Sequence, residues 1–120
     1  MQAIYQSDIS GITADKALEN LFSEEKLADD TKKFASRLAN GSIDNRSAID
    51  AKITGLAKNW TVDRISAINM SILRLSFYEL MFEKETPGAV AINEALELAK
   101  RYSDAESAKF INGILGTAVL

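Results

Sequence analysis

The stretch that decides the fold is TVDRISAINMSILRLSFYELMF, residues 61–82. Its large apolar side chains recur at spacings that place them on more than one side of a helix, and they include Ile65, Ile72, Phe77 and Phe82. A helix that is apolar on several sides is stable only where other elements surround it. We therefore expect residues 61–82 to form the central and most buried helix of the protein.

Helical signals continue on both sides of this stretch. One Pro and six Gly among 120 residues leave few helix breakers, and the alternation that is typical of strands is rare. The sequence therefore predicts an all-α fold and a single domain over residues 1–120. We expect residues 1–59 to form an N-terminal bundle and residues 60–120 a C-terminal bundle. About seven helices are expected, near residues 1–9, 13–22, 29–41, 42–60, 61–82, 88–102 and 103–120.

Local signals mark several helix ends. We expect Gly41 to end the third helix and Ser42 to begin the fourth, because glycine often ends helices and serine often caps them. Pro87 suits a helix start, since its fixed φ is helical and its missing N–H is not needed there. Ser103 and Glu106 have the spacing of a capping box, which would set the start of the last helix.

Three side chains inside the helices indicate specific contacts. Arg74 stands among apolar residues, and a buried guanidinium needs a partner to offset its desolvation. We expect it to form an internal ion pair with Glu79, Glu94 or a helix end. The third helix is expected to carry Phe34 and Leu38. Gly113 lies inside the last helix, where the pattern favours close packing against a neighbouring helix over a surface contact.

Composition excludes several classes of function. The chain has no His and no Cys, which removes the commonest zinc ligands, the thiol nucleophile and the usual general base. With 14 Lys and Arg against 17 Asp and Glu, the net charge is -3, so any nucleic-acid binding must be local. No apolar run is long enough for a membrane span, and residues 1–10 lack a signal-peptide pattern. We therefore expect a cytoplasmic protein that is not an enzyme and needs no metal or cofactor.

Three strings in the second half carry a family resemblance: ILRLSFYEL at 72–80, AINEALELAK at 91–100 and KFINGIL at 109–115. In this order and spacing they resemble the NusB family of bacterial transcription antitermination factors, and QAIY at 2–5 fits the opening helix of that family. The resemblance implies two three-helix bundles and an adaptor without catalysis. It also implies pairing with NusE, a small-subunit ribosomal protein, and binding of single-stranded boxA RNA at the elongating RNA polymerase, chiefly during ribosomal-RNA transcription.

The resemblance implies RNA contacts on the first helix and near the turn between the last two helices. Cations mixed with aromatic rings suit a single strand, because phosphates meet the cations and bases stack on the rings. The residue pattern alone favours another interpretation, in which Tyr102 and Phe110 pack in the core and Arg101 pairs with Glu97. No Arg precedes Arg37, so we expect weak RNA binding that salt reduces further. The predicted RNA-binding residues are Gln2, Tyr5, Lys100, Arg101, Lys109 and Phe110.

The resemblance also implies a surface for the protein partner on the first half of the central helix. Relatives often carry an acidic residue at the position of Asn69, so we expect this chain to form one ion pair fewer with a basic ribosomal partner. Met70 is equally well explained as filling an irregular space in the core. The predicted partner-binding residues are Arg64, Asn69 and Met70.

Two other functions are consistent with the sequence. One is a protein-only scaffold or homodimer, in which the short first helix leaves an apolar groove open. The other is an RNA-binding domain related to ribosomal-RNA cytosine methyltransferases, some of which use the same fold. RNA binding that depends on NusE would support the antitermination factor, whereas dimerisation without RNA affinity would support the scaffold.

Overall fold

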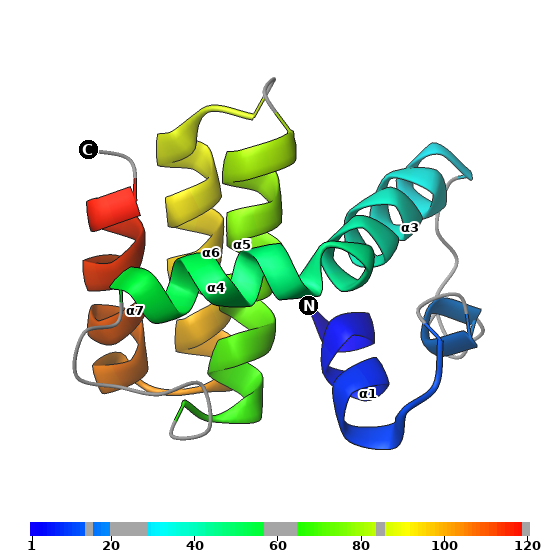
Figure 1. The fold of residues 1–120 in the computed structure, drawn as a ribbon, viewed down its shortest axis with the longest axis horizontal. Coiled ribbons are helices and arrows are strands. Elements are labelled where there is room, and N and C mark those ends of the chain that lie inside the picture. The colour runs from blue at the N-terminus through cyan, green and yellow to red at the C-terminus, as the bar shows by residue number, and fades with distance from the viewer. Residues whose placement is uncertain (14–15, 20–28, 57–64, 84–85, 119–120) are drawn as a thin grey trace.

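The computed structural model describes residues 1–13, 16–19, 29–56, 65–83 and 86–118. Every regular element in these ranges is helical, which confirms the predicted all-α fold (Figure 1). Residues 16–19 are helical at the position of the second expected helix. The longer helices are α1 (Gln2–Ser10), α3 (Asp29–Asp44), α4 (Arg46–Leu56), α5 (Ala67–Phe82), α6 (Gly88–Tyr102) and α7 (Ala105–Ala118).

Helix α5 lies at the centre of the molecule and contacts α1, α3, α4, α6 and α7. The hydroxyl of Ser66 caps its first turn by accepting a hydrogen bond from the backbone N–H of Asn69 at 3.1 Å. Nine of its 16 residues are buried, and these include the large side chains of Ile72 and Phe77. The prediction of a central, most buried helix in this stretch is therefore confirmed.

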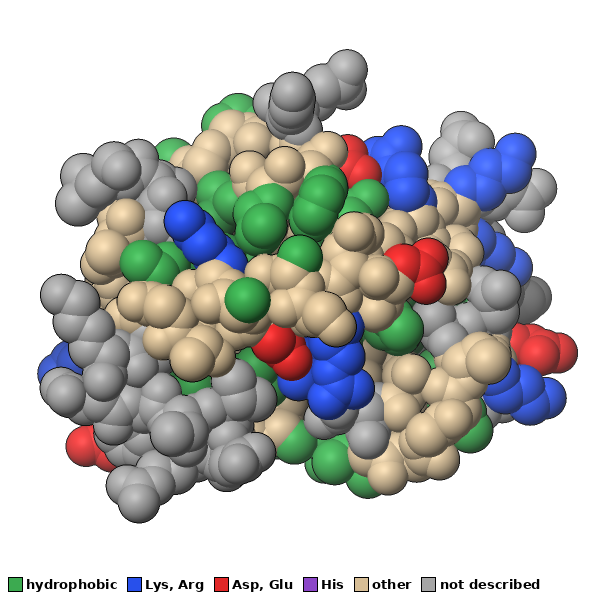
Figure 2. Space-filling model, viewed as in Figure 1, with side chains coloured by type: hydrophobic (Ala, Val, Ile, Leu, Met, Phe, Trp, Pro, Cys, Tyr) green, Lys and Arg blue, Asp and Glu red, His purple; other side chains and the backbone are tan. Residues whose placement is uncertain are grey.

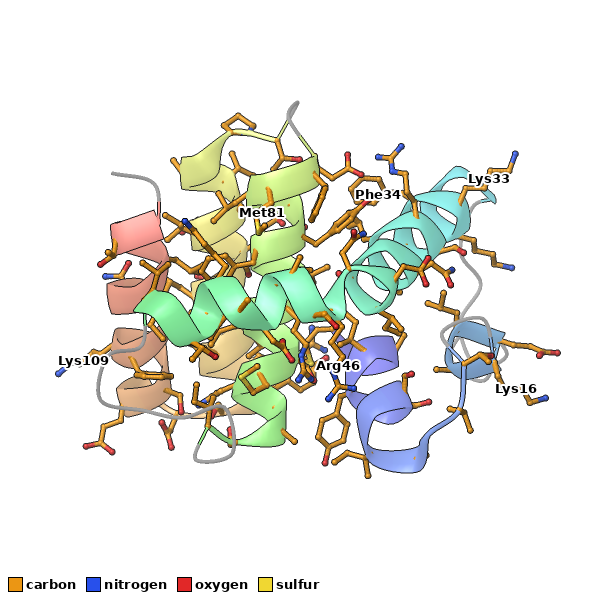
Figure 3. The ribbon with its side chains drawn as sticks, viewed as in Figure 1. Lys16, Lys33, Phe34, Arg46, Met81 and Lys109 are labelled. Atoms are coloured by element: carbon orange, nitrogen blue, oxygen red, sulfur yellow. The ribbon has the colours of Figure 1, made fainter. Side chains whose placement is uncertain are left out.

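The last turn of α5 is the exception to this burial. Met81 and Phe82 are 36% and 43% exposed, although both lie in the stretch that was expected to be buried. This turn leads into the connection to α6, and its neighbours leave one side of it open. Figure 2 shows hydrophobic side chains gathered on the part of the visible face where Met81 is labelled in Figure 3.

Phe34 of α3 also lies at the surface. Its side chain is 48% exposed. The guanidinium of Arg37, one turn further along α3, lies 5.3 Å from the centre of the ring. This distance is typical of a cation–π contact, which stabilises an aromatic ring at an exposed position.

Two apolar clusters fill the interior. One joins α4, α5, α6 and α7 and includes Ile53, Leu73 and Leu115. The other joins α1, residues 16–19 and α3, and includes Ile4. Helix α4 contributes to the first cluster, so it packs with the helices that follow it in the chain. The division into bundles at residues 59 and 60 stays a prediction.

Gly41 does not end a helix. Helix α3 continues through Gly41 and Ser42 to Asp44, and α4 begins at Arg46, so the predicted boundary is wrong. The structure gives a different reason for the glycine: a Cβ atom at this position would collide with the ring of Tyr78. Gly41 therefore lets α3 approach α5 closely.

The start of α7 differs by one residue from the predicted capping box. The carboxylate of Asp104 caps the helix by accepting a hydrogen bond from the backbone N–H of Ser107 at 2.7 Å. The hydroxyl of Ser103 instead donates to the hydroxyl of Ser107 at 2.9 Å. Because the helix begins at Ala105, Glu106 lies one position too early for a capping box, so that prediction is wrong.

Two further signals had opposite outcomes. Pro87 lies directly before the first residue of α6, which confirms its role at a helix start. Gly113 is exposed, and nothing in the described part of the chain lies within 4 Å of the place where its Cβ would be. The predicted close packing at Gly113 is therefore wrong, because α7 turns this side toward the exterior.

Candidate nucleic-acid and partner interface

The N-terminal turn of α5 lies between two groups of helix ends: the N-terminal turn of α1 and the C-terminal turn of α6 on one side, and the N-terminal turn of α7 on the other. The side-chain amide of Gln2 in α1 donates a hydrogen bond to the hydroxyl of Tyr102 in α6 at 3.1 Å. A hollow of about 290 Å³, which we call the α1–α6 hollow, opens between these helices. It is lined by Met1, Gln2, Tyr5, Gln6, Ile68 and Tyr102.

The α1–α6 hollow combines aromatic rings with nearby cations. The guanidinium of Arg101 lies 5.3 Å from the centre of the Tyr102 ring. Lys100 and Arg101 are exposed in the last turn of α6, where their charge offsets the partial negative charge of the helix end. Rings and cations that a single strand could contact therefore lie side by side here.

The structure separates the predicted RNA-binding residues into two groups. Those at the α1–α6 hollow or in the adjacent last turn of α6 are Gln2, Tyr5, Lys100 and Arg101. Lys109 and Phe110 lie on α7 instead, and Lys109 points away from the other helices in Figure 3. Phe110 is half-buried and lines a second hollow. RNA contact by these residues stays a prediction.

The second hollow, which we call the α5–α7 hollow, has a volume of about 410 Å³. Asn69 of α5 is only 8% exposed, and its Nδ2 donates to the hydroxyl of Ser107 at 3.0 Å. The Oδ1 of Asn69 accepts no hydrogen bond from any residue that the structure describes. A buried amide oxygen that lacks a donor is costly, by about 1–3 kcal/mol. The lining residues are Ile65, Ser66, Asn69, Asp104, Glu106, Ser107 and Phe110.

The described part of the lining of the α5–α7 hollow is acidic. Its charged residues are Asp104 and Glu106. Hydrogen bonding to the backbone N–H and side chain of Ser107 lowers the pKa of Asp104, which keeps its carboxylate ionised at neutral pH. Elsewhere, Lys and Arg side chains are spread over the visible face without forming one basic patch (Figure 2).

The predicted partner-binding residues fall in three different environments. Asn69 lies in the α5–α7 hollow. Met70 is 3% exposed and belongs to the apolar cluster of α4 to α7, so it fills the core and offers almost no surface to a partner. Arg64 lies outside the residues that the structure describes.

Behind the interface, Arg74 joins α5 to α4. Its Nε and Nη2 atoms donate to the two carboxylate oxygens of Asp50 at 2.9 and 3.0 Å. The side chain of Arg74 is 4% exposed, and Arg46 approaches the same carboxylate at 3.6 Å. The predicted internal ion pair is confirmed, but its expected partners were wrong, because α4 packs along this side of α5.

Glu79 is a second buried charged group of α5, with 5% of its surface exposed. Burial, together with the negative charges of Glu94 and Glu83, raises the pKa of its carboxyl group from 4.5 to about 7. Glu79 and Glu94 also share a hydrogen bond, which favours the protonated form. The carboxyl group of Glu79 therefore titrates near neutral pH.

Sequence patterns alone missed how Ser66, Asp104 and Ser107 combine with Asn69. Each residue has a signal of its own, since serine and aspartate commonly cap helices. Their convergence depends on the N-terminal turns of α5 and α7 lying together, which no local pattern reveals.

In the described ranges, Asp and Glu side chains form no group of three or more that could hold a metal ion. Every helix described is too short or too polar to span a bilayer.

Comparison with known proteins places these features in a family. The NusB family profile matches residues 1–119. The chain is 40% identical over 133 residues to the transcription antitermination protein NusB of Clostridium botulinum (strain Kyoto / Type A2), covering 99% of this chain and 93% of that protein. The fold matches T. maritima NusB with a TM-score of 0.88 and 37% identity, over 96% of this chain and 81% of the other. It also matches a chain of a crystal structure of antitermination factors NusB and NusE in complex with dsRNA, with a TM-score of 0.87 and 25% identity over 97% and 86% of the two chains.

Proposed function

Because the chain belongs to the NusB family, we propose that it is a transcription antitermination factor that pairs with a NusE-type ribosomal protein and binds boxA-like single-stranded RNA. The observation that carries this proposal is the match of the whole fold to the chain that was crystallised with NusE and RNA. The protein acts in the cytoplasm during ribosomal-RNA transcription and reaches RNA polymerase indirectly, through the assembly. It works by holding its ligands and catalyses no reaction.

The α1–α6 hollow supports the RNA-binding part of the proposal. Tyr5 and Tyr102 offer rings on which unstacked bases can lie, at about 1–3 kcal/mol for each base. Lys100 and Arg101 offer cations for the phosphates that flank such bases. The hydrogen bond between Gln2 and Tyr102 holds α1 beside α6, so rings from two helices contribute to one surface.

Two weak contacts are sufficient for an adaptor of this kind. Once the protein partner is bound, capture of the RNA by the joint surface becomes intramolecular. The effective concentration of the second ligand then rises without any new contact. RNA binding should therefore depend strongly on the protein partner, and it should weaken as salt is added.

The experiment is to measure anisotropy of a labelled boxA-like single strand at low ionic strength, with the chain alone and with a NusE protein. We expect the NusE protein to tighten RNA binding by about tenfold or more. A strand of equal length and shuffled sequence is the control. Absence of any gain from NusE would contradict the proposal, and dimerisation in sedimentation without RNA affinity would favour a protein-only scaffold.

A further inference from the structure

We draw no further inference here: the strongest candidate, the exposed apolar surface of Phe34 on α3, Met81 and Phe82 in the last turn of α5 and Val90 in the first turn of α6, carries none, because nothing in the described part of the structure shows what covers it.

Discussion

The two hollows at one end of this molecule are neighbours with opposite chemistry. The α1–α6 hollow has the rings of Tyr5 and Tyr102, with the cation of Arg101 at its rim. The α5–α7 hollow has the carboxylates of Asp104 and Glu106 and the amide oxygen of Asn69, to which no described residue donates a hydrogen bond. A single end of a small helical protein therefore presents rings and a cation in one hollow and carboxylates in the other.

The largest effect is expected from loss of the buried ion pair that joins α4 to α5. Asp50→Ala would leave the guanidinium of Arg74 buried without its carboxylate, at a cost of about 3–5 kcal/mol in the free energy of unfolding. Arg74→Met removes the buried charge itself and should cost less. Urea unfolding measures both values. If both variants lost the same free energy of unfolding, the unpaired buried charge of Arg74 could not be the main cause of the loss in Asp50→Ala.

A smaller loss in the free energy of unfolding is expected from Gly41→Ala, because Gly41 lines neither hollow. The new Cβ would collide with the ring of Tyr78, so we expect a loss of about 1–3 kcal/mol. The matched control is Gly55→Ala in α4, where open space surrounds the position and alanine should stabilise the helix by about 0.5–1 kcal/mol. Thermal melting distinguishes the two, and a stabilised Gly41→Ala would show that Tyr78 can move away.

The carboxyl group of Glu79 should make stability depend on pH. Its pKa is raised to about 7 in the folded state, so the folded protein holds a proton that the unfolded chain releases near pH 4.5. The free energy of unfolding should therefore fall as the pH rises from about 5 to about 7. Glu79→Gln should be more stable than the wild-type chain at pH 8, by an amount on the order of 2 kcal/mol, and nearly equal to it at pH 4. If the free energies of unfolding of the two proteins changed with pH in the same way, Glu79 would not be the group that titrates.

A change confined to the α1–α6 hollow should separate the two surfaces. Tyr102→Phe keeps the ring but removes the hydroxyl that accepts from Gln2. We expect at most about 1 kcal/mol of lost stability and a modest loss of RNA affinity, with NusE binding unchanged. Isothermal titration with each ligand provides the measurement. An equal loss of affinity for RNA and for NusE would indicate that the two hollows act as one binding site.

The smallest effect on stability is expected for Lys109→Ala, since this side chain is exposed and points away from the other helices in Figure 3. If Lys109 contacts a phosphate, the variant should bind RNA of any sequence more weakly and reduce the salt slope by about 0.7. Its melting temperature should remain that of the wild-type chain. A large change in melting temperature would instead indicate that Lys109 has a structural role.

Sequence patterns predicted the parts of this structure that depend on local or periodic signals. The apolar stretch around Phe77 forms the central helix, and Pro87 precedes α6, because both outcomes follow from preferences of a few consecutive residues. Local sequence patterns could not predict contacts between segments that lie far apart in the sequence. Gly41 matches the signal of a helix end, yet it is required by Tyr78, which lies far along the chain.

The candidate site was predictable to a similar degree. Motifs around Lys100 and Phe110 pointed to the end of the molecule where both hollows open, but they could not distinguish the two hollows, and RNA contact there stays a prediction. The partner of Arg74 is Asp50, in a helix that the sequence pattern did not link to it. The importance of Asn69 depends on its burial against Ser107, which only the packing of α5 against α7 reveals.

The most direct test of two separate hollows is a crossed measurement with Arg101→Ala and Asn69→Leu, each titrated with boxA-like RNA alone and with a NusE protein alone. Arg101→Ala should weaken RNA binding and leave NusE affinity unchanged, whereas Asn69→Leu should weaken NusE binding and leave RNA affinity unchanged. If each variant weakens both ligands to the same extent, one shared surface holds RNA and protein, and the assignment of the two ligands to separate hollows is wrong.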